Sequence, residues 1–353
     1  MRIAYLTSEF ITEGIGGGQA AYLANIASIM AEHGHDVYVF TKSGSNKIIH
    51  WKDNITVICV NCMQESTLVS HFLGRYRISY FMNKKLNEFH RRIRFDVVQF
   101  SNLNGIPLLM KKNLPSIIRI SDFSPAFSMA QTETFDLNNL TISAKEKERL
   151  LAFRKAKSIF GPSKVCADLT AKEIDRQVNV IESPLCVCDT SEKPAFFDDL
   201  LANKSYFLFF GSLNFIKGLH LICEVADRFL DDNPDMYLVF LGLMDHVPYK
   251  GNMVDSMTYI DLTITRHRDH VIVLEPLRNK MNINYILDNS MACIMPSRID
   301  NLPNTCIEAM VRGKVVIGTR GASFDQLIND GENGMLFSVD DSEGLLEKMN
   351  QVA

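Results

Sequence analysis

Short apolar runs alternate with amphipathic stretches through the first half of the chain. The run RIAYLTS, residues 2–8, predicts a buried strand, and residues 20–35 place apolar side chains at helical spacing, with Gly34 as the stop. Further strands are predicted at DVYVFTK, ITVICV, FDVVQFS, SIIRISD, SIFGPS and VNVIESP. Strands that alternate with helices in this way predict a parallel, doubly wound sheet.

The same alternation starts again after Ser183-Pro184. The apolar runs YFLFFGSL, MYLVFLGL, VIVLEPL, ACIMPS, KVVIGT and GMLFS are separated by stretches that include the amphipathic GLHLICEVADRFLDD and the helical CIEAMVRG. We therefore predict an α/β protein with two Rossmann-like doubly wound parallel-sheet domains, residues 1–183 and 184–353. Open sheets of this kind bind ligands at the carboxyl ends of their strands, so two facing domains would place the site in the cleft between them.

The composition fits a folded, two-domain protein. Of its 353 residues, 46% are hydrophobic and 22% charged, and no apolar run reaches the ~18–20 residues that a membrane span needs. The N-terminal stretch MRIAYLTSEF turns polar too early for a signal peptide, so we expect a cytoplasmic protein. Residues 1–183 carry 23 Lys and Arg against 17 Asp and Glu, whereas the remainder carries 14 against 24. This asymmetry indicates an anionic surface or ligand for the first half.

The eight cysteines do not indicate a metal site. Cys59 and Cys62 form a single CxxC pair, and Cys186 and Cys188 a CxC pair, without a second pair at zinc-binding spacing. The cysteines within apolar runs are expected to pack as small hydrophobic residues.

A glycine-rich loop follows the first predicted strand. Gly16, Gly17 and Gly18 lead into the first predicted helix, where free N–H groups and the helix dipole favour an anion such as phosphate. The spacing of Gly16, Gly18 and Ala21 also matches a dinucleotide fingerprint, which keeps an NAD(P)-dependent oxidoreductase as an alternative. However, residues 8–15 separate the glycines from the strand, and no acidic residue ends the second strand. A flexible loop without a ligand is the other alternative.

Two loops of the second half carry charged residues at predicted strand ends. Gly211 ends an apolar run and Lys217 opens the next helix, where a lysine can bind phosphate as a point charge. Asp300 lies in the loop DNLPN, and Glu308 follows it with seven residues between them. A solvated lysine and a glutamate that complements a helix dipole are the plainer interpretations of each residue alone. Together, a cation for a diphosphate and carboxylates for hydroxyl groups indicate a nucleotide-sugar site.

These motifs resemble those of the GT-B glycosyltransferases of family 4. The resemblance rests on Gly211, Lys217-Gly218, Pro296-Ser297, Asp300, Glu308-Ala309-Met310, Gly313 and GASFDQLINDGENG at residues 321–334. It spans nearly the whole chain and is most specific between residues 206 and 337. It implies two domains facing across a cleft, retention of the anomeric configuration, and catalysis without a metal or other cofactor, with the nucleotide sugar as a substrate.

The resemblance also implies roles for individual residues. Glu308 would accept hydrogen bonds from the ribose, and Asp300 would face the donor sugar. Lys217 would hold the diphosphate, aided by the loop Gly16–Gly18. The catalytic candidates are Asp300, Lys217, Glu308 and Asp122. The donor-binding candidates are Gly16, Gly17, Gly18, Ser212, Lys217, Glu275, Leu277, Asn301, Leu302, Pro303, Asn304, Thr305 and Glu308.

The chain departs from the family pattern in three places. Ser212 replaces the arginine that usually follows the first glycine, and Asp300 replaces a glutamate. The usual histidine of the first domain is also missing, and the strand ends there offer Gln99, Asn102, Arg119 and Asp122. The leading hypothesis is a hexosyltransferase that moves a sugar from a UDP-sugar, or alternatively a GDP-sugar, to a glycan or lipid-linked acceptor in cell-surface polysaccharide or glycoconjugate synthesis. The alternative is a catalytically silent relative that binds nucleotide sugar or glycan as a partner subunit.

Residues 71–95 are basic and amphipathic. They contain seven Arg and Lys against Glu88, interleaved with apolar side chains. Such a helix is typical of peripheral contact with an anionic membrane surface, here the inner surface, where a lipid-linked acceptor would be found. A core helix with a basic outer face is the alternative. Nucleic acid is not an expected partner, because no binding module accompanies the charge.

Overall fold

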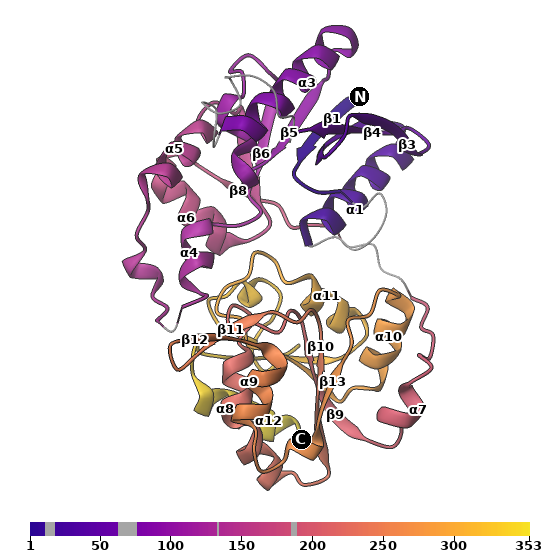
Figure 1. Ribbon diagram of the computed structural model, residues 1–353, viewed down its shortest axis with the longest axis vertical. Helices are drawn as coiled ribbons and strands as arrows, with labels where there is room; N and C mark the ends of the chain where they lie inside the picture. The colour runs from indigo at the N-terminus through magenta and orange to yellow at the C-terminus, as the bar shows by residue number, and fades with distance from the viewer. Residues whose placement is uncertain (11–17, 63–75, 133, 185–188) are drawn as a thin grey trace. The chain divides into compact units, whose positions relative to one another are not determined.

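The two series of alternating strands and helices form two separate units. The computed structural model describes residues 1–10, 18–62, 76–132, 134–184 and 189–353. Unit 1 comprises Met1–Phe123 and Thr141–Leu185, and unit 2 comprises Ser124–Leu140 and Cys186–Ala353. Each unit is a sheet with helices on its two faces (Figure 1). The segment Ser124–Leu140 groups with unit 2, an assignment that the sequence division at residues 183 and 184 did not include.

Unit 1 contains an eight-stranded sheet with the order β3-β4-β2-β1-β5-β6-β7-β8. Neighbouring strands are parallel except for β3 and β4, which are antiparallel. The strands are β1 (Arg2–Thr7), β2 (Asp36–Ser43), β3 (Lys47–Lys52), β4 (Ile55–Asn61), β5 (Val97–Ser101), β6 (Ser116–Arg119), β7 (Ser158–Gly161) and β8 (Asn179–Val180).

The sequence patterns located most of these strands. The run VNVIESP contributes only the two residues of β8. Strand β3 was not predicted, because it is an edge strand with no fully buried residue and its register shifts between His50 and Lys52. The helices of unit 1 are α1 (Gly18–Glu32), α3 (Arg77–Ile93), α5 (Ala144–Phe153) and α6 (Lys164–Ile174), with a 3₁₀ segment η2 (Leu103–Leu109).

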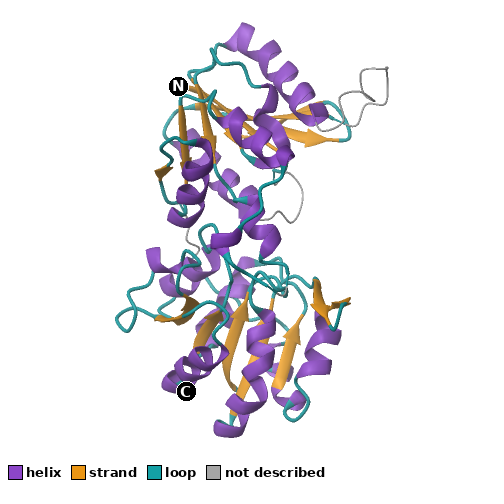
Figure 2. Cartoon of the chain, turned by 90° about the vertical axis from the view of Figure 1, so that its left-hand side faces the viewer, coloured by secondary structure: helices purple, strands orange, loops and turns teal. Residues whose placement is uncertain are grey.

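Unit 2 contains a six-stranded parallel sheet with the order β13-β10-β9-β14-β15-β16 and a separate antiparallel pair, β11 with β12. The six strands are the predicted apolar runs, and Figure 2 shows them as a layer between helices. The strands are β9 (Ser205–Phe210), β10 (Met236–Leu241), β11 (His246–Tyr249), β12 (Asn252–Asp255), β13 (Val271–Leu274), β14 (Ala292–Met295), β15 (Val315–Thr319) and β16 (Met335–Phe337).

Two hydrophobic clusters cover the two faces of the unit 2 sheet. One packs α8, α9 and α12 against the strands, and the other packs α7, α10 and α11. Cys223 lies in the first cluster and Cys293 and Cys306 in the second, and burial raises the pKa of each thiol to about 12, as expected for cysteines that act as hydrophobic residues. The helices are α4 (Ser124–Met129), α7 (Phe197–Leu200), α8 (Leu219–Asp232), α9 (Ser256–Thr263), α10 (Lys280–Asn289), α11 (Asn304–Val311) and α12 (Ser342–Val352), with 3₁₀ turns at η3 (Leu137–Asn139), η4 (Arg268–His270) and η5 (Phe324–Gln326).

The strand order of each sheet reverses once. In unit 1 the reversal lies between β1 and β5, and in unit 2 between β9 and β14. The loops that leave the carboxyl ends of two such strands run in opposite directions and open a crevice, which is where open α/β sheets bind ligands. Each unit therefore has one preferred position for a site.

The helices of the described residues include none that is both long and apolar enough to cross a membrane.

Candidate functional site

Lys217 and Asp300 meet at the strand reversal of unit 2. Lys217 follows β9 and Asp300 follows β14, the two neighbouring strands between which the order reverses. The Lys217 ammonium forms an ion pair with Oδ2 of Asp300, and the two side chains keep 29% and 12% of their exposure. The structure thus brings together two predicted residues that lie 83 positions apart, at a place that solvent still reaches.

Gly218 allows the turn that carries Lys217. Its φ is +76°, and a Cβ atom there would lie only 2.0 Å from the carbonyl oxygen of Pro296. The backbone N–H of Lys217 donates to Oδ1 of Asn214 at 3.0 Å, which fixes the start of the turn. Because the turn packs directly on the loop after β14, it sets the distance between Lys217 and Asp300.

The loop that carries Asp300 is held by hydrogen bonds. Oδ1 of Asp300 accepts from the N–H of Asn301 at 2.9 Å, and the Asp300 carbonyl accepts from Oγ of Ser323 at 2.7 Å. Oδ1 of Asn301 is buried and has no partner among the described residues. Buried amide oxygens normally accept a hydrogen bond, so a ligand hydroxyl is a suitable donor here.

Glu308 lies within α11, the helix that follows this loop. Its Oε1 accepts a hydrogen bond from Nζ of Lys280 at 3.1 Å, and the two side chains are 20% and 40% exposed. Lys280 begins α10 and was not among the predicted site residues. The sequence analysis predicted no helix at Lys280, and its contact with Glu308 depends on how α10 packs against α11.

The remaining predicted residues of unit 2 lie at the same edge of the sheet. Ser212 follows β9, Glu275 and Leu277 follow β13, and Leu302–Thr305 lead into α11. The strands are parallel, so their carboxyl ends share one edge. The first N–H groups of α11 have no partner within the helix and are directed toward this edge.

Arg298 is a buried residue of this region that the sequence analysis missed. Its side chain is 4% exposed, and Nε pairs with Oδ1 of Asp340 at 2.7 Å. Its Nη1 donates to the carbonyl oxygens of Thr132 and, at 3.4 Å, of Ala130. The guanidinium lies 5.0 Å from the ring centroid of Phe215. These contacts attach the segment Ser124–Leu140 to the loop after β14.

The groups around Arg298 shift one another's protonation. Burial raises the pKa of Asp340, but the neighbouring His220 and Arg298 outweigh it and hold that pKa below its usual value. Burial lowers the pKa of His220, whose ring stacks on Phe215 at 4.1 Å. The cluster therefore contains one cation, one carboxylate and a neutral imidazole at neutral pH.

The predicted residues of unit 1 are only partly described. Gly16 and Gly17 lie outside the described residues, and Gly18 is the first residue of α1. Oδ1 of Asp122 accepts from Nδ2 of Asn102 at 2.8 Å. It stays a prediction that Gly18 and Asp122 share a site with Lys217. The cleft between the units also stays a prediction.

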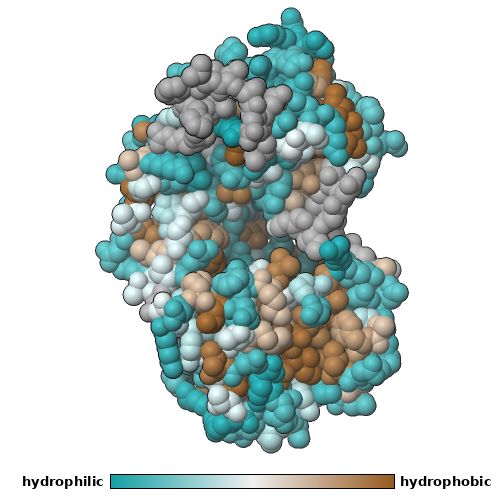
Figure 3. All heavy atoms as spheres, in the orientation of Figure 1, coloured by the Kyte–Doolittle hydropathy of each residue, from teal (hydrophilic) through white to brown (hydrophobic). Residues whose placement is uncertain are grey.

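Helix α3 covers the described part of the basic stretch 71–95, whose residues 71–75 lie outside the description. Ser79, Met82, Asn83 and Leu86 form its buried face. Within α3, all of which is described, no apolar side chain is exposed. Hydrophilic side chains dominate the end of unit 1 where α3 lies (Figure 3). The exposed face of α3 is thus charged rather than apolar.

Comparison with protein families identifies one match. Residues 192–353 match the profile of the family described as glycosyl transferases group 1. A search of curated protein sequences finds no match.

Solved structures with a similar fold include several glycosyltransferases. A structure described as trehalose-6-phosphate from E. coli bound with UDP-2-fluoro glucose has a TM-score of 0.74 at 11% identity, with 100% of this chain and 91% of that chain covered. Sucrose-phosphate synthase from Thermosynechococcus elongatus has a TM-score of 0.71 at 15% identity, with 99% and 89% covered. WaaG, a glycosyltransferase involved in lipopolysaccharide biosynthesis, has a TM-score of 0.67 at 15% identity, with 99% and 90% covered. At these identities the likeness shows the GT-B fold.

Proposed function

From the match of residues 192–353 to the glycosyl transferases group 1 family, we propose that the chain transfers a sugar from a nucleotide-sugar donor to a glycan or lipid-linked acceptor. A UDP-sugar is the expected donor, with a GDP-sugar as the alternative, and the transfer retains the anomeric configuration without a metal ion. Glycan assembly at the cell surface is the expected setting, with the enzyme on the cytoplasmic side.

The ion pair of Lys217 with Asp300 at the strand reversal carries this proposal. A lysine at the carboxyl end of β9 supplies the positive charge that a diphosphate needs. The first N–H groups of α11 supply further donors at the same edge. When the diphosphate binds Lys217, the Asp300 carboxylate becomes free to accept hydrogen bonds from the donor sugar.

The departure of the diphosphate is the step that these groups assist. The bond between the anomeric carbon and the diphosphate oxygen breaks, and its electron pair stays on the diphosphate. The acceptor hydroxyl oxygen bonds to the same carbon and gives its proton to the departing diphosphate. The negative charge that grows on the leaving group is stabilised by Lys217 and by backbone dipoles that are already in place.

Replacement of Glu308 with glutamine tests the nucleotide site. Oε1 of Glu308 is held by Lys280, and Oε2, which has no partner within the described chain, is left for the ribose. Loss of a charged acceptor costs about 1.5–3 kcal/mol, which corresponds to a roughly 10- to 100-fold higher Kd for UDP. Calorimetric titration of the wild type and the variant with UDP and GDP measures this change.

Glu347→Gln is the matched control, because Glu347 is an exposed glutamate of α12 that bonds only to Gln351 among the described residues. Its UDP affinity should equal that of the wild type. A folded Glu308→Gln protein that binds UDP as tightly as the wild type would contradict the assignment of Glu308 to the ribose.

Ser212 gives a reason to keep a second candidate function. The family's diphosphate site usually has an arginine at this position, and here the charge of Lys217 is already balanced by Asp300. A catalytically silent protein that binds nucleotide sugar as a partner subunit would not need the positive charge of that arginine. Tight UDP binding without release of UDP from any UDP-sugar, tested over a panel of glycan acceptors, distinguishes it from the enzyme.

Peripheral membrane contact through α3 is expected to be electrostatic. The exposed charges of α3 include Arg91 and Arg92, and no exposed apolar side chain accompanies them. Each basic residue contributes about 1 kcal/mol near an anionic surface. We therefore expect Arg91→Gln with Arg92→Gln to weaken sedimentation with phosphatidylserine vesicles by about 20- to 30-fold.

Two exposed lysines of unit 1 outside α3, Lys111 and Lys112, provide the control as a double glutamine variant. High salt should release the wild type from the vesicles, because screening shortens the range of the attraction. Equal vesicle binding by all three proteins would favour the interpretation of α3 as a core helix.

A further inference from the structure

Arg119 of unit 1 is a buried cation, and the described residues place no counter-charge beside it. It ends β6 and is 5% exposed. Its Nη1 donates to Oγ of Ser121 and its Nη2 to Oγ of Ser183, both at 2.9 Å. The guanidinium carbon lies 3.6 Å from the ring centroid of Tyr22. All of these partners are neutral, and among the described residues no carboxylate pairs with it. A buried charge in such surroundings costs several kcal/mol unless an anion is supplied.

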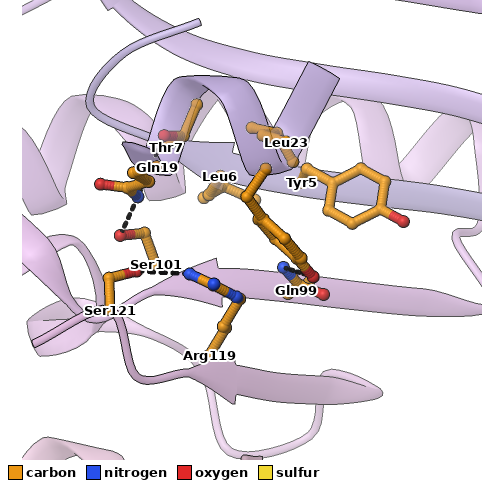
Figure 4. A pocket seen from close by; sticks show the side chains of 10 residues that line it. Tyr5, Leu6, Thr7, Gln19, Leu23, Gln99, Ser101, Arg119 and Ser121 are labelled. Atoms are coloured by element: carbon orange, nitrogen blue, oxygen red, sulfur yellow. Dashed lines mark hydrogen bonds between the residues drawn. The ribbon is translucent and has the colours of Figure 1, made fainter. Parts of the chain in front are cut away.

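A small cavity lies beside this guanidinium. Its volume is about 10 Å³, and in Figure 4 the side chains of Gln19, Ser101, Ser121 and Arg119 converge on it. That volume is about the size of one water molecule, so the enclosed part holds one oxygen atom. The lining residues are Tyr5, Leu6, Thr7, Gln19, Tyr22, Leu23, Gln99, Ser101, Arg119 and Ser121.

The polar groups of the cavity favour an anion. The lining residues include the cation Arg119 and contain no Asp or Glu. Oγ of Ser121 accepts from Arg119, and Oγ of Ser101 accepts from Nε2 of Gln19 and from the N–H of Leu103, which leaves the hydroxyl hydrogens of both serines as donors for a ligand. Nε of Arg119 is buried and has no hydrogen-bond partner in the described part of the chain. A water molecule would fill the volume, but it would leave the charge unbalanced.

The position of the cavity also favours a ligand. It is lined by the ends of β1, β5 and β6 and by the start of α1. The strand order of the sheet reverses between β1 and β5. This is the place where an open α/β sheet binds its ligand, and it is the equivalent in unit 1 of the position that Lys217 and Asp300 occupy in unit 2.

We propose that this cavity is an oxyanion subsite, in which Arg119, Ser121 and Ser101 hold one oxygen of a phosphate or carboxylate group. The rest of the anion lies at the mouth of the cavity. The assignment of this anion to the acceptor rests on the proposed glycosyl transfer. In that reaction the acceptor carries the phosphate or carboxylate group, as a sugar phosphate or an acidic sugar does. The binding of the anion itself does not depend on the transfer reaction.

Inorganic phosphate is the probe that tests the subsite. The full chain is titrated calorimetrically with phosphate at constant ionic strength, with and without saturating UDP, and the titration is repeated with glucuronate as the carboxylate probe. We expect phosphate to bind with UDP present, and Arg119→Met to weaken that binding by at least about tenfold, the size expected for one charged hydrogen bond. Arg119→Lys should retain part of the affinity.

Three further variants show whether phosphate binds in this cavity or at Lys217 of unit 2. Ser121→Ala and Ser101→Ala each remove a single cavity donor and should each weaken phosphate binding severalfold, and this result tests the subsite even if Arg119→Met fails to fold. Lys217→Met should leave phosphate binding to the UDP-free protein detectable.

An Arg119→Met protein that is less stable but binds phosphate as well as the wild type would overturn the proposal, and so would a wild type that binds neither phosphate nor glucuronate. A failure of the proposed transfer would instead show as absent UDP binding or turnover, with the phosphate result unchanged.

Discussion

Replacement of Arg298 with methionine is expected to lower the free energy of unfolding by about 3–5 kcal/mol. The variant leaves Asp340, whose side chain is 33% exposed, without its cation and the carbonyl oxygens of Ala130 and Thr132 without their donor. Methionine fills much of the space but donates no hydrogen bond. Urea denaturation followed by far-UV circular dichroism measures the change, because the single tryptophan, Trp51, lies in unit 1 and does not report on unit 2.

Arg320→Met is the control for Arg298. Arg320 also pairs with an aspartate of unit 2, Asp330 at 2.7 Å, but its side chain is 52% exposed. Pairs at such exposure contribute less than about 1 kcal/mol. Similar unfolding free energies for the two variants would show that the Arg298 contacts do not hold the segment Ser124–Leu140 in place.

Replacement of Asp300 with asparagine is expected to lower the rate of donor turnover by about 10²- to 10³-fold, the range found when one preorganised electrostatic contact to a transition state is removed. Its UDP affinity should stay the same or increase, because Lys217 loses the carboxylate that competes with the diphosphate. Release of UDP from a UDP-sugar, with water or a glycan as acceptor, measures the rate, and calorimetry measures the affinity.

Two further variants serve as comparisons for the Asp300→Asn protein. Lys217→Met should lower both turnover and UDP affinity, because it removes the cation itself. Asp269→Asn changes an aspartate whose side chain is 81% exposed and should alter neither. Wild-type turnover by the folded Asp300→Asn protein would exclude Asp300 from the reaction.

Much of the candidate site in unit 2 could be proposed from the sequence because its residues lie in short motifs. The pair Lys217-Gly218 and the spacing of Asp300 and Glu308 are local patterns, and their place at strand ends follows from the apolar runs before them. The contact between Lys217 and Asp300 requires that β9 and β14 be neighbours, which the pattern of either strand does not contain. The parallel order of the sheet supplies that information.

The residues that the sequence analysis missed have partners without a sequence signal. Arg298 binds backbone carbonyls 166 and 168 positions away, and any residue could supply a carbonyl there. Lys280 was not singled out in the sequence, and its partner Glu308 lies on another helix. Arg119 was noted at a strand end, but the absence of a carboxylate beside it among the described residues depends on which strands flank β6.

By itself the sequence determined the two series of strands and helices, the α/β class and the order of the motifs, because hydrophobic periodicity, helix stops and glycine turns act over a few residues. Only the tertiary structure decided which strand ends are adjacent, where the charge of Arg119 is left unbalanced, and why Ser124–Leu140 belongs with unit 2. These outcomes depend on the pairing of distant strands and on the burial of charges. Both are properties of the whole packed chain, and no short stretch of it contains them.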